Sequence, residues 1–181
     1  MRLAVYGNLI ADRLIIIDSP LLSGESHNCV KTLYQAGGLA NFCRITTEHQ
    51  IIPVSQISND ESGWMILKEL RKYVDINEIS ITYTSHTSNA TVIIDPTTNT
   101  RTGIVQWGAC RRKKNWLPIL ADWHHLMYLD RMTITENKLS SFSSPISADF
   151  CDINQIHNYN HLIRHLDFLI VSELNCGRIL D

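Results

Sequence analysis

The stretch Ala36-Gly37-Gly38-Leu39-Ala40-Asn41 is the part of this sequence that decides its fold. Paired glycines let a ligand approach the backbone, because neither residue has a Cβ. The apolar spacing from Leu39 to Thr47 fits a helix, so the glycines lead into a helix N-terminus with free N–H groups. Asn41, one turn into that helix, offers both a donor and an acceptor. We expect a site for a polyol here, although a glycine pair before a helix also occurs as a plain turn.

The residues before the glycines predict a strand and a hairpin. Arg2 to Tyr6 is a short apolar run closed by a Gly-Asn pair, which suits a buried strand. Asp12 is expected just past the end of that strand. Two β-rich pieces, Leu14 to Asp18 and Cys29 to Tyr34, are separated by turn residues, which favours a hairpin that ends at the glycine pair.

After the glycines, strand-like and helix-like segments alternate. Residues 51–57 favour a strand, and Asp60 then caps a helix whose buried stripe is expected to be Trp64, Leu67, Leu70 and Tyr73. A second hairpin is predicted, and the alternation then resumes; these segments are 90–95 with 102–107, strands at 126–129, 146–150 and 168–171, and a helix within 153–166. Such alternation predicts a mainly parallel sheet covered on both faces, with ligands at the carboxyl ends of its strands.

Composition limits the class of protein. The chain has 181 residues, 44% of them apolar and 19% charged, which suits one domain with a sizeable core. A net charge of -2 gives no reason to expect nucleic acid or a membrane as partner, so a small molecule is expected. We find no signal peptide or membrane span. The five cysteines include no C-x-x-C pair, which indicates reduced thiols and a cytoplasmic protein.

Three other patterns are weaker. Gly103 and Gly108 have the gap of a phosphate-binding P-loop, but alanine and cysteine follow where that loop needs Lys and Ser or Thr. The histidines at 157, 161 and 165 could face a metal, yet they lack the H-E-x-x-H glutamate, and a solvated helix face is the preferred interpretation. The basic run 111–114 is also interpreted as solvated, although it could contact an anionic substrate.

The ordered set of motifs resembles the ribokinase-like (PfkB) carbohydrate kinase family. The set comprises Asp12 after the first strand, then Gly24-Glu25-Ser26, then the glycine pair with Asn41. The segment 58–63 is similar to the family's G-x-D-x-x-G turn, and 87–95 with 101–107 resembles its second pair of lid strands. The similarity covers essentially the whole chain.

The resemblance implies a three-layer α/β/α sandwich with a small β-strand lid that closes over a sugar or sugar phosphate. The chain would be a single incomplete domain, 1–181, with lid hairpins at approximately 13–35 and 88–108. Some relatives pair as homodimers through the lid. The residues implied to bind substrate are Asp12, Gly37, Gly38, Asn41, Ala90, Val92 and Asp130.

Two departures from the family pattern matter. The family's N-x-x-E, which helps to place magnesium and phosphates, aligns with Ser172-Glu173-Leu174-Asn175, so Ser172 and Asn175 are the candidate cofactor-binding residues for ATP and Mg²⁺. The family's D-T-x-G-A-G-D, which holds the catalytic base, is expected beyond Asp181, so no catalytic residue or metal ligand is assigned. We therefore expect the N-terminal two-thirds of an ATP-dependent carbohydrate kinase, complete in its sugar site and inactive as an isolated chain. The alternative is a noncatalytic sugar-binding or interaction protein derived from such a kinase.

Overall fold

The main sheet is built around β1 (Arg2–Tyr6), whose residues Ala4, Val5 and Tyr6 are fully buried. The computed structural model describes residues 1–45, 48–112, 116–150 and 153–171. In it the main sheet has six strands in the order β10-β9-β8-β1-β4-β5, and every neighbouring pair is parallel. The other strands are β4 (Gln50–Ser58), β5 (Ile79–Thr82), β8 (Trp123–Leu126), β9 (Ile146–Asp149) and β10 (Phe168–Ile170). The expectation of a mainly parallel sheet is confirmed.

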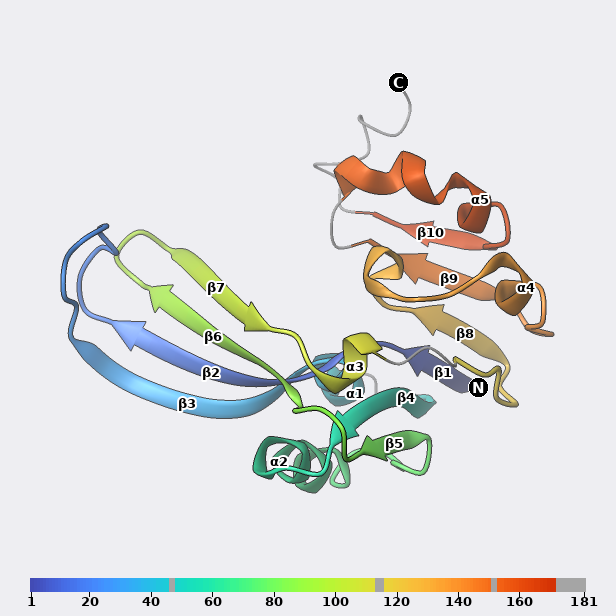
Figure 1. Ribbon diagram of the computed structural model, residues 1–181, viewed down its shortest axis with the longest axis horizontal. Coiled ribbons are helices and arrows are strands. Elements are labelled where there is room, and N and C mark those ends of the chain that lie inside the picture. The colour runs from blue at the N-terminus through green and yellow to red at the C-terminus, as the bar shows by residue number, and fades with distance from the viewer. Residues whose placement is uncertain (46–47, 113–115, 151–152, 172–181) are drawn as a thin grey trace.

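A second sheet projects from the carboxyl edge of the main sheet and forms the lid (Figure 1). Its four strands lie in the order β3-β2-β6-β7. They are β2 (Leu9–Ile17), β3 (Cys29–Gly38), β6 (Ser88–Asp95) and β7 (Thr100–Gln106). β2 pairs with β3 and β6 pairs with β7 as antiparallel hairpins, while β2 and β6 run parallel and join the two hairpins.

Helices and loops cover both faces of the main sheet. Successive residues of β1 point to opposite faces, so each face contributes to its own core. Leu3 and Val5 pack with α1 (Leu39–Ile45) and α2 (Glu61–Leu70) in one core. Ala4 and Tyr6 pack in a second core with the segments that follow β7. The short elements there are α3 (Ala109–Arg112), η1 (Leu129–Arg131), α4 (Glu136–Leu139), η2 (Ile153–Tyr159) and α5 (Asn160–Ile163). Within the described ranges, no helix is long and apolar enough to cross a membrane.

The expected buried stripe of α2 is half wrong. Trp64 and Tyr73 are 48% and 52% exposed, whereas Ile66, Leu67 and Leu70 are buried. The cap at Asp60 fixes where the helix begins. Ile66 and Leu70, which lie one turn apart, therefore face the core, and Trp64 points away from it. Tyr73 lies beyond the end of the helix.

Several expected bounds were also wrong. Asp12 lies inside β2 rather than just past a strand end, because the chain passes from Tyr6 to Leu9 through only two residues. The strand expected at 126–129 is β8, which ends at Leu126; Tyr128 then takes a left-handed conformation with a φ of 56°. The helix expected within 153–166 is a 3₁₀ helix followed by the four-residue α5. β5 was not predicted.

Gly38 joins the lid to the body. Its φ is +61°, and a Cβ at this position would lie 2.2 Å from the carbonyl oxygen of Asn8. That same carbonyl accepts the N–H of Leu39 at 2.9 Å, which holds the start of α1 against the end of β1. The junction therefore needs glycine, as the sequence predicted for this pair.

Candidate functional site

Asp12 and Gly37 lie together on one face of the lid. Asp12 pairs with Gln35 and Ile10 pairs with Gly37, so Gly37 is the diagonal neighbour of Asp12 on the same face. A Cβ on Gly37 would lie 1.9 Å from Oδ2 of Asp12 and 2.5 Å from its Cγ. The carboxylate can occupy this position only because residue 37 has no side chain.

The carboxylate of Asp12 is available to a ligand. Burial raises its pKa, and the positive charge of Arg44 acts in the opposite direction. No hydrogen bond or ion pair to this carboxylate is formed within the described part of the chain. A partly buried carboxylate without donors is unusual, because buried polar groups are normally paired. Its oxygens can accept hydrogen bonds from ligand hydroxyls.

The lid strands β2 and β6 bring two further predicted residues to this face. Asp12 lies opposite Ala90, and Leu14 lies opposite Val92, in the parallel pairing of β2 with β6. Ala90 is buried and Val92 is partly exposed. Ala90 therefore lies beside the Asp12 carboxylate, and Val92 lies farther out along the lid. Their contact with a sugar stays a prediction.

A network of hydrogen bonds fixes the base of β3. Glu69 of α2 accepts the N–H of Ala36 at 2.8 Å and Nε of Arg44 at 3.0 Å. Arg44 of α1 also donates to the carbonyl of Ala36 and to Oδ1 of Asn41. Although burial alone would raise the pKa of Glu69, the bonds from Ala36 and Arg44 lower it below its usual value. Asn41 is exposed, and its side-chain oxygen Oδ1 already accepts a hydrogen bond from Arg44.

A second network fixes the base of β6. Asp60 caps α2 by accepting the N–H of Gly63 at 2.8 Å. Its two oxygens also accept the N–H of Thr87 at 2.7 Å and the hydroxyl of Thr87 at 2.6 Å. Burial would raise the pKa of Asp60, but the bonds from Thr87 and Gly63 lower it. Asp60 thus holds the lid to α2.

The remaining predicted residues lie elsewhere. Asp130 is in η1, just after β8, and its side chain is 2% exposed and pairs with Nε of Arg131 at 3.2 Å. The structure therefore groups Asp12, Gly37 and Ala90, and it holds Asp130 with Arg131. Ser172 and Asn175 lie outside the described residues.

The weaker motifs gain no support as ligand sites. Arg111 lies over the ring of Trp107, 5.5 Å from its centroid, and Lys113 and Lys114 lie outside the described residues. His165 is 3.4 Å from the hydroxyl of Ser140. In the described ranges, no group of three or more histidine, cysteine or acidic side chains is placed to hold a metal ion.

The sequence did not point to Arg44 or Glu69, nor to a third polar residue of this region, Asn8. It closes β1 at its carboxyl end and is 1% exposed, and its Nδ2 has no partner within the described ranges. A buried donor without an acceptor is costly, which makes it a candidate for a ligand or a bound water. Its place directly after a buried strand was the available signal. Arg44 and Glu69 gave no such signal, since the fold alone brings them together.

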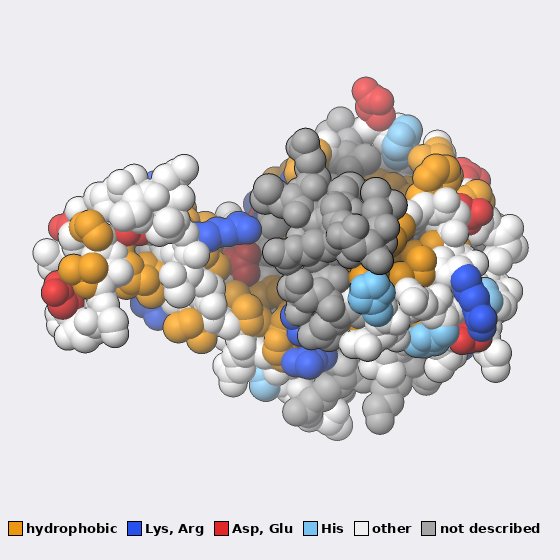
Figure 2. Space-filling view, turned by 90° about the horizontal axis from the view of Figure 1, so that it is seen from above, with side chains coloured by type: hydrophobic (Ala, Val, Ile, Leu, Met, Phe, Trp, Pro, Cys, Tyr) orange, Lys and Arg blue, Asp and Glu red, His pale blue; other side chains and the backbone are white. Residues whose placement is uncertain are grey.

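A cavity of about 610 Å³ lies at the base of the lid. Asp12 and Ala90 border it, but most of its lid wall comes from the opposite face, including Arg13, Tyr34 and Thr91, and α2 closes it. The cavity thus opens toward α2, whereas the Asp12 carboxylate faces away from that helix. The view from above shows a hollow between lid and body, with basic and acidic side chains beside it (Figure 2).

Comparison with known proteins gives structural matches alone. No family model matches the chain, and no curated protein sequence matches it. A ribokinase from Cryptococcus neoformans in complex with ADP matches with a TM-score of 0.74 and 16% identity, over 99% of this chain and 60% of that one. A nucleoside kinase from Burkholderia thailandensis in complex with inosine matches with a TM-score of 0.75 and 11% identity, over 100% and 63%. An Arabidopsis thaliana ribokinase complexed with ribose and ATP matches with a TM-score of 0.69 and 18% identity, over 92% and 58%.

The chain therefore spans about 60% of the length of the solved kinases that it matches. At these identities the likeness concerns architecture. The parallel six-stranded sheet, its covering helices and the four-stranded lid give this chain the ribokinase-like α/β fold.

Proposed function

We propose that this chain carries the sugar-binding half of an ATP-dependent kinase that phosphorylates a hydroxyl of a sugar. The observation that carries the proposal is the Asp12 carboxylate, which is partly buried, accepts no hydrogen bond from the described residues and lies over Gly37 at the base of the lid. Sugar hydroxyls are donors that such a carboxylate lacks. Binding one would relieve the cost of its burial.

Asn8 supports the same conclusion from the other side of the hydrogen bond. Its buried Nδ2 is a donor without an acceptor in the described part of the chain. Its main chain and that of Gly38 are in close contact, so it lies at the junction between body and lid. A hydroxyl can both donate and accept. A polyol at this junction could therefore serve the carboxylate and the amide together.

Ribose, free or as part of a nucleoside, is the proposed substrate. The matched structures contain inosine in one case and ribose in another, and both compounds carry a ribosyl group. A phosphorylated sugar is less suitable, because its charge would approach the Asp12 carboxylate. In the basic run 111–114, the side chain of Arg111 is engaged with the ring of Trp107, 5.5 Å from its centroid.

ATP enters the proposal through the matched structures, and Mg²⁺ enters it through the family resemblance alone. The matched ribokinases contain ADP or ATP. The described residues include no metal-binding cluster, and Ser172 and Asn175 lie outside them. They therefore do not fit a complete nucleotide and metal site, and we assign no described residue to either cofactor. We also propose that the chain forms a single domain and acts in the cytoplasm, which agrees with the free thiols of Cys29, Cys43 and Cys110.

Calorimetric titration of the purified chain with D-ribose and with inosine tests the binding proposal. Saturable binding is expected, and it should weaken about tenfold or more in Gly37→Ala and Asp12→Asn. Gly103→Ala is the matched control, since it changes a glycine of the same lid that has nothing within 4 Å of an added Cβ. The absence of binding by the unchanged chain, or equal loss in the control, would overturn the proposal.

The noncatalytic alternative is separated by a second measurement. ADP formation from ATP and Mg²⁺ is followed with the sugar that binds. Because the isolated chain is expected to bind sugar without turnover, the assay is also made on a longer product of the same gene. Turnover by that longer product supports the kinase, and sugar binding without turnover in both supports a noncatalytic binder.

A homodimer through the lid is the proposed assembly. The same face of the lid carries an apolar patch bordered by Lys31 and Arg101, and its residues are Leu14, Ile16, Leu33, Val92, Ile94 and Val105. Leu33 and Val105 are 39% and 41% exposed, and a second lid of the same kind would cover them. Sedimentation equilibrium should show a dimer that Leu33→Asp dissociates. Ile104→Asp, on the opposite face of the lid, should leave it intact, and a monomeric unchanged chain would contradict the proposed assembly.

A further inference from the structure

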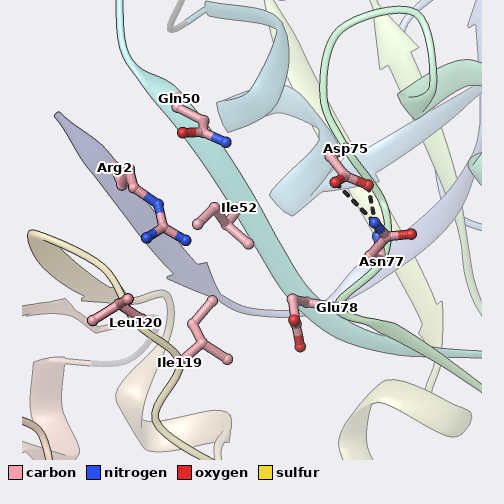
Figure 3. Close-up of a pocket in the computed structure, with 8 residues that line it drawn as sticks. All are labelled: Arg2, Gln50, Ile52, Asp75, Asn77, Glu78, Ile119 and Leu120. Carbon is pink, nitrogen blue, oxygen red and sulfur yellow. Dashed lines mark hydrogen bonds between the residues drawn. The ribbon is translucent and has the colours of Figure 1, made fainter.

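A second hollow lies at the amino edge of the main sheet, at the opposite end of the strands from the lid. Its volume is about 280 Å³. This is slightly below the range of about 300–1,000 Å³ that small-molecule sites usually occupy, so only a small ligand would fit. The residues that matter for its chemistry are Arg2, Ile52, Asp75, Glu78, Ile119 and Leu120 (Figure 3).

The parallel sheet explains why these residues meet. Arg2 begins β1 and pairs with Gln50, which begins β4. Glu78 immediately precedes β5, and the loop with Ile119 leads into β8. Because all these strands are parallel, their amino ends lie at the same edge. The lid leaves from the carboxyl ends, so this hollow is separate from the proposed sugar site.

Opposite charges face each other across the hollow without pairing. Figure 3 shows Arg2 on one side and Asp75, Asn77 and Glu78 on the other, with Ile52 between them. In the described part of the chain, neither the guanidinium of Arg2 nor the carboxylate of Glu78 forms a hydrogen bond or an ion pair. Asp75 uses its carboxylate to hold the N–H of Asn77 at 3.1 Å and its side-chain amide at 2.9 Å.

Hydrogen bonds hold the backbone at Arg2 in place. The N–H of Arg2 donates to Oδ2 of Asp122 at 2.6 Å, and the carbonyl of Arg2 accepts the N–H of Asp122 at 2.9 Å. The N–H of Gln50 donates to the carbonyl of Met1 at 3.1 Å. The backbone of Arg2 is thus fixed between two neighbouring segments, and its side chain lies across the hollow from Glu78 (Figure 3).

The rest of the wall is apolar. Ile52 and Ile119 are partly buried, and Leu120 is 78% exposed beside them. A ligand that carried only a positive or only a negative charge would leave the other wall charge without a partner. A ligand with both charges and a small apolar group would match all three parts of the hollow.

We propose that this hollow binds a zwitterionic α-amino acid with a small apolar side chain. Its carboxylate pairs with the guanidinium of Arg2, which can form two parallel hydrogen bonds to a carboxylate. Its ammonium group lies against Glu78 and Asp75, and its side chain packs on Ile52 and Ile119. This site is independent of the proposed kinase function.

Titration of the ¹⁵N-labelled chain with L-valine, followed by NMR, tests the proposal. Amide signals of residues 2, 50, 52, 75–78 and 119–120 should shift and saturate at millimolar valine, while signals of the lid hairpins should stay in place. Isobutyrate and isobutylamine each carry one of the two charges on a similar apolar group. Each should bind at least about tenfold more weakly than valine.

Two variants and two controls complete the test. Arg2→Met and Glu78→Gln should each weaken valine binding about tenfold or more, with an unchanged thermal unfolding midpoint. Arg101→Met and Glu25→Gln remove exposed lid charges of the same kinds and should bind valine as the unchanged chain does. No saturable shift with valine, equal binding of isobutyrate, or unchanged binding by both hollow variants would overturn the proposal. All four variants should bind ribose as the unchanged chain does, because the hollow is separate from the sugar site. A failure of the valine proposal can therefore be distinguished from a failure of the sugar-binding proposal.

Discussion

The carboxylate of Asp12 occupies the space that a side chain at position 37 would need, because a Cβ on Gly37 would lie 1.9 Å from its Oδ2. The two residues come from neighbouring strands of the lid and face the same side. A side chain at position 37 would therefore displace the carboxylate of Asp12, and this coupling can be measured.

A double-mutant cycle between these residues should show that coupling. Gly37→Ala pushes the Asp12 carboxyl group aside, so it should lower the free energy of unfolding when Asp12 is present. In an Asp12→Ala background the space is open, and the same change should have little effect. The coupling energy is expected to be about 0.5–3 kcal/mol by urea denaturation. Additive effects would contradict the contact.

Gly38→Ala should be more damaging than Gly37→Ala. The added Cβ would meet the backbone oxygen of Asn8 at 2.2 Å, and the φ of +61° is unfavourable for alanine. A backbone atom cannot rotate away as a carboxylate can. We expect a loss of about 1–3 kcal/mol in the free energy of unfolding, measured by urea denaturation, and Gly103→Ala should show no such loss.

Asp12→Asn should stabilise the ligand-free protein at neutral pH. Burial raises the pKa of Asp12, so the folded state favours the protonated form, and stability is lost as pH rises through the folded pKa. Asparagine removes this loss. The variant should unfold at a higher temperature than the unchanged chain at pH 7, and the difference should vanish below about pH 4, near the ordinary pKa of aspartate. A variant that was less stable at neutral pH would contradict the assignment.

Glu69→Gln should have the opposite pH signature. The pKa of Glu69 is lowered by Ala36 and Arg44, so its contribution to stability is complete above the ordinary glutamate pKa of about 4.3 and is lost as pH falls through the folded pKa. The variant should lose about 1–3 kcal/mol at neutral pH, because Arg44 and Ala36 lose a charged acceptor. When the pH is lowered from neutral to acidic, the free energy of unfolding should fall less in the variant than in the unchanged chain. Glu25→Gln, at an exposed lid position, should behave as the unchanged chain.

Thr87→Val should loosen the joint between α2 and β6. The hydroxyl of Thr87 donates to Asp60 and accepts the N–H of Ser58 at 3.0 Å, and valine can do neither. Removing it should lower the free energy of unfolding by about 1–3 kcal/mol and speed hydrogen exchange of the Ser58 amide. Thr102→Val, on exposed β7, is the matched control, and an equal effect there would argue against a special role for Thr87.

The parts of the fold that depend on local pattern could be predicted. Buried β1 and β4 appear as apolar runs, both lid hairpins follow from their turn residues, and the Asp60 cap follows from the residues before α2. The error at Trp64 has a physical cause, since an aromatic residue next to a helix start can cover the surface as well as the core. Short elements such as β5 and α5 are set by the sheet they pack on, and their own sequences carry little signal.

The candidate site was predictable only in part. Asp12 and Gly37 are far apart in sequence, and the resemblance to a family linked them where spacing could not. The prediction of Ala90 as a site residue also came from the family resemblance. The Arg44 and Glu69 pair, by contrast, depends on how α1 and α2 pack against β3, and no motif in the sequence indicated it. Asp130 carried an expected role, but its carboxylate pairs with its own neighbour, Arg131.

The lid is anchored at its root by the Gly38 junction, the Glu69 network and the Asp60 network, which fixes strands that continue well beyond them. Because the lid is held at one end only, a small rotation at its base moves its free end over a large distance. β2 has nine residues and extends about 30 Å, so a bend of about 10° near its root would carry the tip about 5 Å. The stiffness of these three contacts would then set how readily the lid bends. Substitutions far from any ligand could therefore change the rate at which a ligand enters and leaves.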